Sequence, residues 1–207
     1  MNNDFSDITF NRKTVKVFDT NCKISHEEML EILNETVTAP SSVNFQPWRF
    51  IVVESKEGKE KLRPLVQDNT RQNDTSSAMI LIFGDLECQK NADEITNRAI
   101  EAGFMSQEVK DHVMNVAVPS FEQASREKLN DIVKMDCALA AMQLMLIARA
   151  HGYDTNAIGG FDHDKLGEVF GMDSQRYVPA LIIAIGKSNY KSHDTIRLDA
   201  QEVTSFA

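Results

Sequence analysis

The sequence predicts an α+β protein whose helices and strands follow one another without a regular βαβ alternation. A long apolar helix over 125–150, a continuous apolar strand at 79–83 and two further strands at 48–53 and 178–185 carry this prediction. The chain has 207 residues, of which 42% are apolar, so it can bury a substantial core as one domain, 1–207.

The first elements are marked by a helix cap and by prolines. The ten N-terminal residues are mostly polar, and we expect them to fray. A helix begins after Ser25, which forms a capping box with Glu28, and it ends before Pro40 because a proline disfavours helical geometry in the preceding residue. Strand 48–53 is rich in aromatic and β-branched residues, and a short helix follows that ends near Pro64.

The middle of the chain contains the most strongly apolar elements. Residues 79–83 form a continuous apolar run, which is typical of a strand covered on both faces. Residues 88–118 are mostly helical in propensity. The second half of helix 125–150 is apolar on nearly all sides, so this helix should be central or lie in a subunit interface, and Gly152 ends it.

The C-terminal part combines short elements with turns. We expect a short strand before Gly159, a helix opened by Asp162 and the strand 178–185. The last twenty residues are polar and should form an extended arm.

Charge and composition exclude several classes of protein. The chain has 22 basic and 31 acidic side chains, a formal charge of −9, which argues against non-specific nucleic-acid binding. No apolar stretch approaches the roughly 18 residues that a membrane span requires, and the N-terminus does not resemble a secretory signal. Three widely spaced cysteines favour a reducing compartment, so we expect a cytoplasmic protein without nucleic-acid or membrane partners.

Generic motifs point to no catalytic side chain and no metal. There is no GxGxxG or GxSxG motif, and position 181 is Leu where a phosphate-binding loop ending at Gly186-Lys187-Ser188 would need glycine. Cys137 lies on an apolar helix face, which is typical of an inert core thiol. The histidines are scattered and form no metal-ligand pattern: His26, His112, His151, His163 and His193.

Two segments carry stronger signals: 11–18, with the sequence NRKTVKVF, and 39–48, with the sequence APSSVNFQPW. Together they resemble the FMN-dependent nitroreductase family, in which an Arg-x-Ser/Thr-x-Lys/Arg-x-Phe segment precedes a Pro-Ser-Ser-x-Asn-x-Gln-Pro-Trp loop. Weaker family features are matched in the same order by Asn69 with Gln72, by the run 158–162 (IGGFD) and by Arg197.

The resemblance implies an FMN site. Its residues would be Arg12, Lys13, Thr14, Lys16, Pro40, Ser41, Ser42, Asn44, Asn69, Gln72, Gly159, Gly160 and Arg197. The basic residues suit the phosphate of FMN, because Arg12 can donate two parallel hydrogen bonds and Arg197 can approach from the tail. Thr14 and Lys16 are two residues apart, so in an extended segment they share a face.

The resemblance also implies roles around the flavin ring. Lys16 would lie near N1 and O2 of the ring, where it would stabilise the negative charge that two-electron reduction creates. The loop 40–44 would reach the FMN of the other subunit, and residues 159–160, lacking Cβ atoms, would let the backbone approach the ring. Gln72 stands where the family often has lysine, which removes a charge near the flavin.

As a member of this family, the protein would have a mainly antiparallel sheet flanked by helices and a C-terminal arm exchanged in a homodimer. It would pass a hydride from NADH or NADPH through flavin N5 to a small-molecule acceptor such as a nitroaromatic or a quinone, with no side chain as catalyst. Phe104 and Phe121 could form a pocket wall or belong to the core. Residues 85–125 lie outside the motifs and leave the acceptor open.

Three alternatives remain at the level of sequence. A flavoenzyme of the same superfold could act on a narrow set of substrates. A storage or sensor protein could bind FMN without turnover, and an interaction protein would bind no flavin at all.

Overall fold

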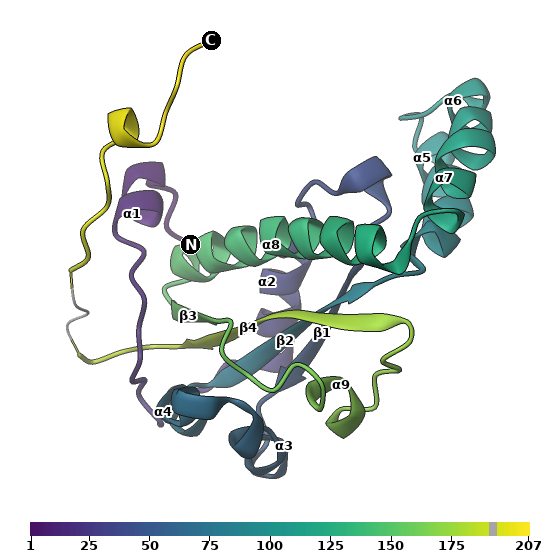
Figure 1. The fold of residues 1–207 in the computed structure, drawn as a ribbon. Coiled ribbons are helices and arrows are strands. Elements are labelled where there is room, and N and C mark those ends of the chain that lie inside the picture. Colours follow the sequence, from purple (N-terminus) through teal and green to yellow (C-terminus); the bar gives the residue numbers. More distant parts are fainter. Residues whose placement is uncertain (191–193) are drawn as a thin grey trace.

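The computed structural model describes residues 1–190 and 194–207, so His193 lies outside the described residues. At the centre is an antiparallel sheet with the strand order β1-β2-β4-β3 (Figure 1). Its strands are β1 (Trp48–Val53), β2 (Ala78–Asp85), β3 (Asp154–Ile158) and β4 (Tyr177–Gly186). The α+β prediction and the antiparallel sheet are therefore confirmed.

The two central strands are covered on both faces. Every residue of β2 is buried, which agrees with the continuous apolar run in its sequence. Ile80 pairs with Ile183, and the register shifts between Ile82 and Phe83, where β4 contains a proline. Because β2 and β4 hold the middle of the sheet, β1 and β3 form its two edges.

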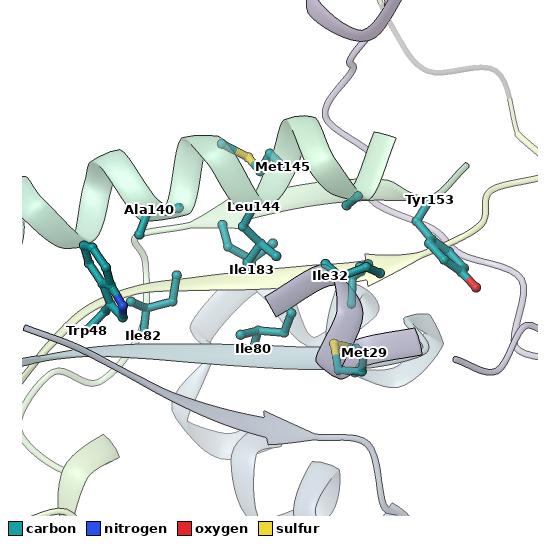
Figure 2. Close-up of a cluster of buried hydrophobic side chains, with 14 of the residues drawn as sticks. Met29, Ile32, Trp48, Ile80, Ile82, Ala140, Leu144, Met145, Tyr153 and Ile183 are labelled. Carbon is teal, nitrogen blue, oxygen red and sulfur yellow. The ribbon is translucent and has the colours of Figure 1, made fainter. Parts of the chain in front are cut away.

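One face of the sheet is covered by α2 (His26–Thr36) and α8 (Arg126–Ala150). The Ser25 hydroxyl accepts a hydrogen bond from the backbone nitrogen of Glu28, as the predicted cap requires. Figure 2 shows Ile32 and Leu144 packed with Ile183 between these helices and the sheet. Helix α8 lies above the sheet and runs roughly along β4 (Figure 1).

The opposite face carries α3 (Lys56–Leu62), α4 (Thr70–Thr75) and α9 (Leu166–Val169). A second core cluster lies beneath them and includes Leu62, Phe83 and Phe161. The prediction that Asp162 opens a helix is corrected: its carboxylate accepts hydrogen bonds from the backbone nitrogens two and three residues later, which caps a turn. The helix itself begins at Leu166.

The region 88–118, predicted as helical, forms a group of short helices at one end of the sheet (Figure 1). They are α5 (Ala92–Glu101), α6 (Gln107–His112), a π-helical turn (Val113–Ala117) and α7 (Val118–Glu122).

The N-terminus is ordered, which corrects the prediction that it frays. Residues Phe5–Phe10 form α1, whose first turn is capped by the Asp4 carboxylate. Asp7 forms an ion pair with Arg149 on α8, in which Oδ1 of Asp7 lies 3.3 Å from Nη2 of Arg149. The C-terminal residues leave the body as an extended arm with one 3-10 turn at Ala200–Glu202 (Figure 1). Among the described residues, no helix combines the length and apolarity needed to cross a membrane.

Candidate functional site

A cavity of about 300 Å³ joins residues from both ends of the chain. Arg12, Lys13 and Thr14 line it from the N-terminal segment, and Arg197 lines it from the C-terminal arm. The Lys13 ammonium lies 3.4 Å from a carboxylate oxygen of Asp194. Three cations thus meet at one place in a protein that is acidic overall, and four of the predicted site residues share one cavity.

The segment that carries these cations runs along the outer edge of β3. Thr14 forms a parallel bridge with Thr155, the backbone nitrogen of Val15 donates to the carbonyl of Thr155, and the amide of Asn156 donates to the carbonyl of Val15. Val15 is buried, whereas Thr14 and Lys16 are exposed on either side of it. This alternation puts Thr14 and Lys16 on one face of an extended segment, as the sequence predicted.

A second group of predicted residues lies just beyond the far end of β3. The Asn69 amide donates to the Gly160 carbonyl at 3.0 Å, and the Gln72 amide donates to the Asn69 side chain at 3.0 Å. A Cβ atom on Gly160 would approach an oxygen of Gln67 to 3.3 Å, whereas one on Gly159 would meet nothing within 4 Å. The backbone is therefore open at Gly159 and tightly fitted at Gly160.

The loop before β1 has an unusual backbone. Val43, Asn44 and Gln46 have φ values of 54°, 56° and 51°, in the left-handed region that residues other than glycine seldom adopt. Each such residue costs about 1–3 kcal/mol and persists only where the surroundings enforce it. Backbone strain of this kind occurs often at binding and catalytic sites.

Two charged side chains, the buried Asp136 and the partly exposed Arg49, hold this loop. The Asp136 carboxylate on α8 accepts hydrogen bonds from the backbone nitrogen and the hydroxyl of Ser42, each at 3.1 Å. Burial raises the pKa of Asp136, and the hydrogen bonds from Ser42 offset part of that rise. Arg49 donates to the Gln46 carbonyl at 3.1 Å and is itself held by the fully buried Asp85 at 2.9 Å.

The remaining residues of the loop have smaller roles. Pro40 is exposed, and the Ser41 hydroxyl accepts a hydrogen bond from the backbone nitrogen of Gln46. Asn44 is exposed and lines a cavity of about 860 Å³ together with Phe104. Phe121 instead belongs to the core, where its ring meets that of Phe45 edge-on with centroids 4.9 Å apart.

Within one chain, the predicted site residues form two separate sets. The set at residues 12–16, 69–72 and 159–160 lies along and beyond β3, and the loop 40–46 lies before β1. These strands are opposite edges of the sheet, three strand spacings or about 14 Å apart. The cavity of Arg12 contains no residue of the loop, and the cavity of Asn44 contains none of the N-terminal cations.

Sequence reasoning missed the residues that hold the loop. Asp136 precedes Cys137 at the start of the most apolar stretch of α8. An acidic residue in an apolar helix stretch could have indicated a buried carboxylate that binds another part of the chain. Arg49 lies within the strand 48–53 and gave no signal of its own. Cys137 is an inert core thiol as predicted, since burial raises its pKa to about 12.

Comparison with known proteins identifies the family. Residues 10–187 match the model of the Nitroreductase family. The chain belongs to the nitroreductase family. It is therefore an oxidoreductase, and the family resemblance of the two motifs is confirmed.

Individual members of the nitroreductase family match over nearly their whole length. The Bacillus subtilis protein named "Putative NAD(P)H nitroreductase YdgI" is 46% identical, and the match covers 99% of this chain and 98% of that protein. The CLA biosynthesis enone reductase of Lactiplantibacillus plantarum is 39% identical, with 100% and 95% covered. A crystal structure from Exiguobacterium sibiricum, described as a putative nitroreductase in complex with FMN, is 44% identical with a TM-score of 0.95, covering 99% of this chain and 97% of that one.

Proposed function

We propose that this protein is a homodimeric oxidoreductase that binds FMN, takes a hydride from NADH or NADPH and delivers it to a small organic acceptor. The observation that carries the proposal is the cavity in which Arg12, Lys13, Thr14 and Arg197 meet. The FMN-bound nitroreductase structure from Exiguobacterium sibiricum, which the fold matches closely, supports the same ligand.

The donors in this cavity fit a phosphate group. A phosphate monoester carries nearly two negative charges, and guanidinium groups can donate two parallel hydrogen bonds to its oxygens. Three cations and the hydroxyl of Thr14 line the cavity, and the buried hydroxyl of Thr9 has no hydrogen-bond partner among the described residues. An additional anionic acceptor would satisfy this hydroxyl as well as the cations.

The outer edge of β3 fits the rest of the cofactor. From Thr155, beside Thr14, to Gly159 the strand advances by about 13 Å at its usual rise per residue. The space beside Gly159 is open, the Asn69 amide lies next to Gly160, and the Gln72 amide donates to the Asn69 side chain. Such a strip suits a ligand with a phosphate at one end and a flat polar ring at the other.

Each group of residues would then have its own task. When bound, FMN supplies the two-electron chemistry that carries a hydride from NAD(P)H to the acceptor. Arg12 and Arg197 hold the phosphate, and Lys16 sets a positive charge on the exposed face of the segment. Asn69 would offer a hydrogen bond to the polar edge of the ring, the buried Gln72 would hold the Asn69 side chain in place, and Gly159 leaves room for the ring.

A homodimer would complete the site. Because the loop 40–46 and β3 lie at opposite edges of one sheet, Ser41 and Asn44 can reach a flavin on β3 only from a second copy. Met135, Leu139 and Met142 form an exposed apolar stripe along α8 that a second copy would cover. The arm also exposes large apolar side chains, and exchanging it between subunits would bury them: Ile196, Leu198, Val203 and Phe206.

The acceptor belongs to one of two chemical classes. A nitroaromatic is supported by the family and by the name of YdgI, and a quinone, another two-electron acceptor, is placed with it. An α,β-unsaturated carbonyl, the narrow-substrate alternative, is supported by the 39% identity to an enone reductase. We further propose that the single domain works in the cytoplasm, where its three cysteines stay as free thiols.

The test begins with the absorption spectrum of the purified protein, which should show oxidised flavin. Anaerobic mixing with NADH and with NADPH should bleach it, and a nitroaromatic, a quinone and an enone should then restore it at rates that rank the acceptors. Bleaching without restoration by any acceptor would support a storage or sensor protein. A colourless protein that takes up no added FMN would overturn the proposal.

A further inference from the structure

A third cavity, of about 330 Å³, lies on the α3 and α4 side of the sheet. Its wall includes Lys23 from the loop before α2, Lys59 on α3 and Ser76 just before β2. It shares no lining residue with the cavity of Arg12. The family motifs do not include these residues, so this cavity has no part in the proposed flavin site.

Lys59 is an atypical lysine. Its side chain is partly buried, and its ammonium group donates to the backbone carbonyl of Ser76. Within the described residues, no carboxylate lies within ion-pair distance of Lys59. Burial and, to a lesser extent, the positive charge of Lys23 lower its pKa to about 8, against a smaller opposing effect of Asp74.

The acidic groups around the cavity are each engaged with another base. Glu54 pairs with His26, Glu60 lies 3.8 Å from Lys56, and both oxygens of Asp74 lie 3.1 Å from Arg63. Lys23 has no ion-pair partner in the part of the chain that is described. The two lysines therefore face the cavity together, and the charge of Lys23 raises the cost of charging Lys59.

A neutral lysine amine is a nucleophile, and this cavity also attracts anions. With Lys59 neutral, three cationic side chains line it against three carboxylates, and Lys56 and Arg63 are paired with two of those acids, so Lys23 is the lining cation that can meet an anion. We propose that Lys59 is a site of covalent acylation by small acyl phosphates. The Lys23 ammonium at the cavity wall would attract the phosphate of such a reagent, and Lys59 would meet its carbonyl carbon.

The reaction balances without any further reagent. The Lys59 nitrogen forms a bond to the acyl carbon, and the bond between that carbon and the bridging phosphate oxygen breaks. Inorganic phosphate leaves with the electron pair, and the proton lost by the nitrogen passes to water. The product is an uncharged amide, so the repulsion between Lys59 and Lys23 disappears together with the ammonium donor to Ser76.

The experiment follows acylation of the intact protein by acetyl phosphate, with each lysine quantified by peptide mass spectrometry. Lys61, exposed on the same helix, is the internal reference. At pH 7.5 about a quarter of Lys59 is neutral, against about one in a thousand for an ordinary lysine. A weaker base is also a weaker nucleophile, so the net expectation is that Lys59 reacts about tenfold faster than Lys61. Its rate should level off above about pH 8, whereas that of Lys61 should rise further.

Two variants test the cause. Lys23→Met removes the neighbouring charge, so the Lys59 rate at pH 7.5 should fall severalfold, while Lys187→Met, outside the cavity, should leave it unchanged. An uncharged aryl acetate should discriminate less between Lys59 and Lys61 than acetyl phosphate does. Equal rates at Lys59 and Lys61, no effect of Lys23→Met, or equal discrimination by both reagents would overturn the proposal.

Discussion

The Asp136 carboxylate lies 3.1 Å from both the backbone nitrogen and the hydroxyl of Ser42, so a single side chain of α8 fixes the loop that precedes β1. That loop contains three residues in the left-handed region, and without enforcement it would relax to other conformations. The same helix carries the exposed apolar stripe. The position of the loop is therefore tied to the surface that we assign to the dimer.

Replacing Asp136 with alanine should loosen the loop. The substitution leaves the Ser42 backbone nitrogen without an acceptor, which costs about 1–3 kcal/mol. We expect this loss of stability in urea unfolding, and about tenfold weaker FMN binding by fluorescence titration. Asp131→Ala, which removes an exposed acid from the same helix, should change neither. If the Asp136 variant bound FMN normally, the loop would have no role in the site.

Asp136 should also leave a pH signature. Because burial raises its pKa above 3.8, the native state holds this proton to higher pH than the unfolded state does. Its contribution to stability is therefore present at low pH and is lost as the pH rises from about 4 through the native pKa. Asp136→Asn cannot titrate, so its melting temperature should rise relative to that of the wild type between pH 4 and 7. If the difference in melting temperature between Asp136→Asn and the wild type stayed constant over this range, the pKa of Asp136 would not be raised in the native state.

The cation cavity can be tested one arginine at a time. Arg12→Ala and Arg197→Ala each remove a charge-assisted contact with phosphate, worth about 1.5–3 kcal/mol, so FMN affinity should fall about 10- to 100-fold. Arg63→Ala, which removes an exposed arginine outside the cavities of Arg12 and Asn44, is the control and should bind FMN normally. Riboflavin, which has no phosphate, should bind both Arg variants and the wild type with similar affinity.

Lys16 should act on the potential of the flavin more than on its retention. A cation about 4 Å from a reduced ring contributes at most a few kcal/mol before desolvation, and 1.4 kcal/mol corresponds to about 30 mV for a two-electron couple. Lys16→Ala should therefore keep FMN and lower its midpoint potential by tens of millivolts in a dye-coupled titration. The control Lys61→Ala should leave the midpoint potential unchanged. If Lys16→Ala also left it unchanged, Lys16 would have no role in setting the potential of the flavin.

The apolar stripe of α8 is the test of the dimer. Met142→Glu places a charge on the surface that a second copy would cover, so light scattering should report a monomer. That monomer should lose FMN, because the loop 40–46 would no longer reach the cofactor. Val169→Glu makes the same change on an exposed residue of α9 and should leave the dimer intact. A flavin-bound monomer would show that one chain makes the whole site.

The sequence predicted those features that depend on neighbouring residues. The Ser25 cap, the buried run at 79–83 and the long helix after Ser125 are local patterns, and each was confirmed. The helix at Phe5–Phe10 was missed because its support includes the ion pair from Asp7 to Arg149, far along the chain. Fraying was the reasonable expectation for so short and polar a segment.

The candidate site was predicted through motif order and not through contacts. No local pattern brings Arg12 next to Arg197, and the resemblance to a family supplied that pairing. The hold of Asp136 on Ser42 spans 94 positions of sequence, so neither residue reveals the other. The pairing of Asn69 with Gln72 could be predicted from their spacing, because residues three apart lie on the same face of a helix. In the structure the two side-chain amides are hydrogen-bonded.

The bridge between Thr14 and Thr155 has a consequence for handling the protein. An unoccupied strand edge invites other chains to add to it, which is a common route to aggregation. Residues 14–15 block this route at the outer side of β3, and they do so with the segment that carries the basic cluster. Repulsion among those basic groups favours detachment of the segment when no anion balances them. Protein from which the flavin has been removed should therefore aggregate more readily at low ionic strength, and inorganic phosphate in the buffer should reduce this aggregation.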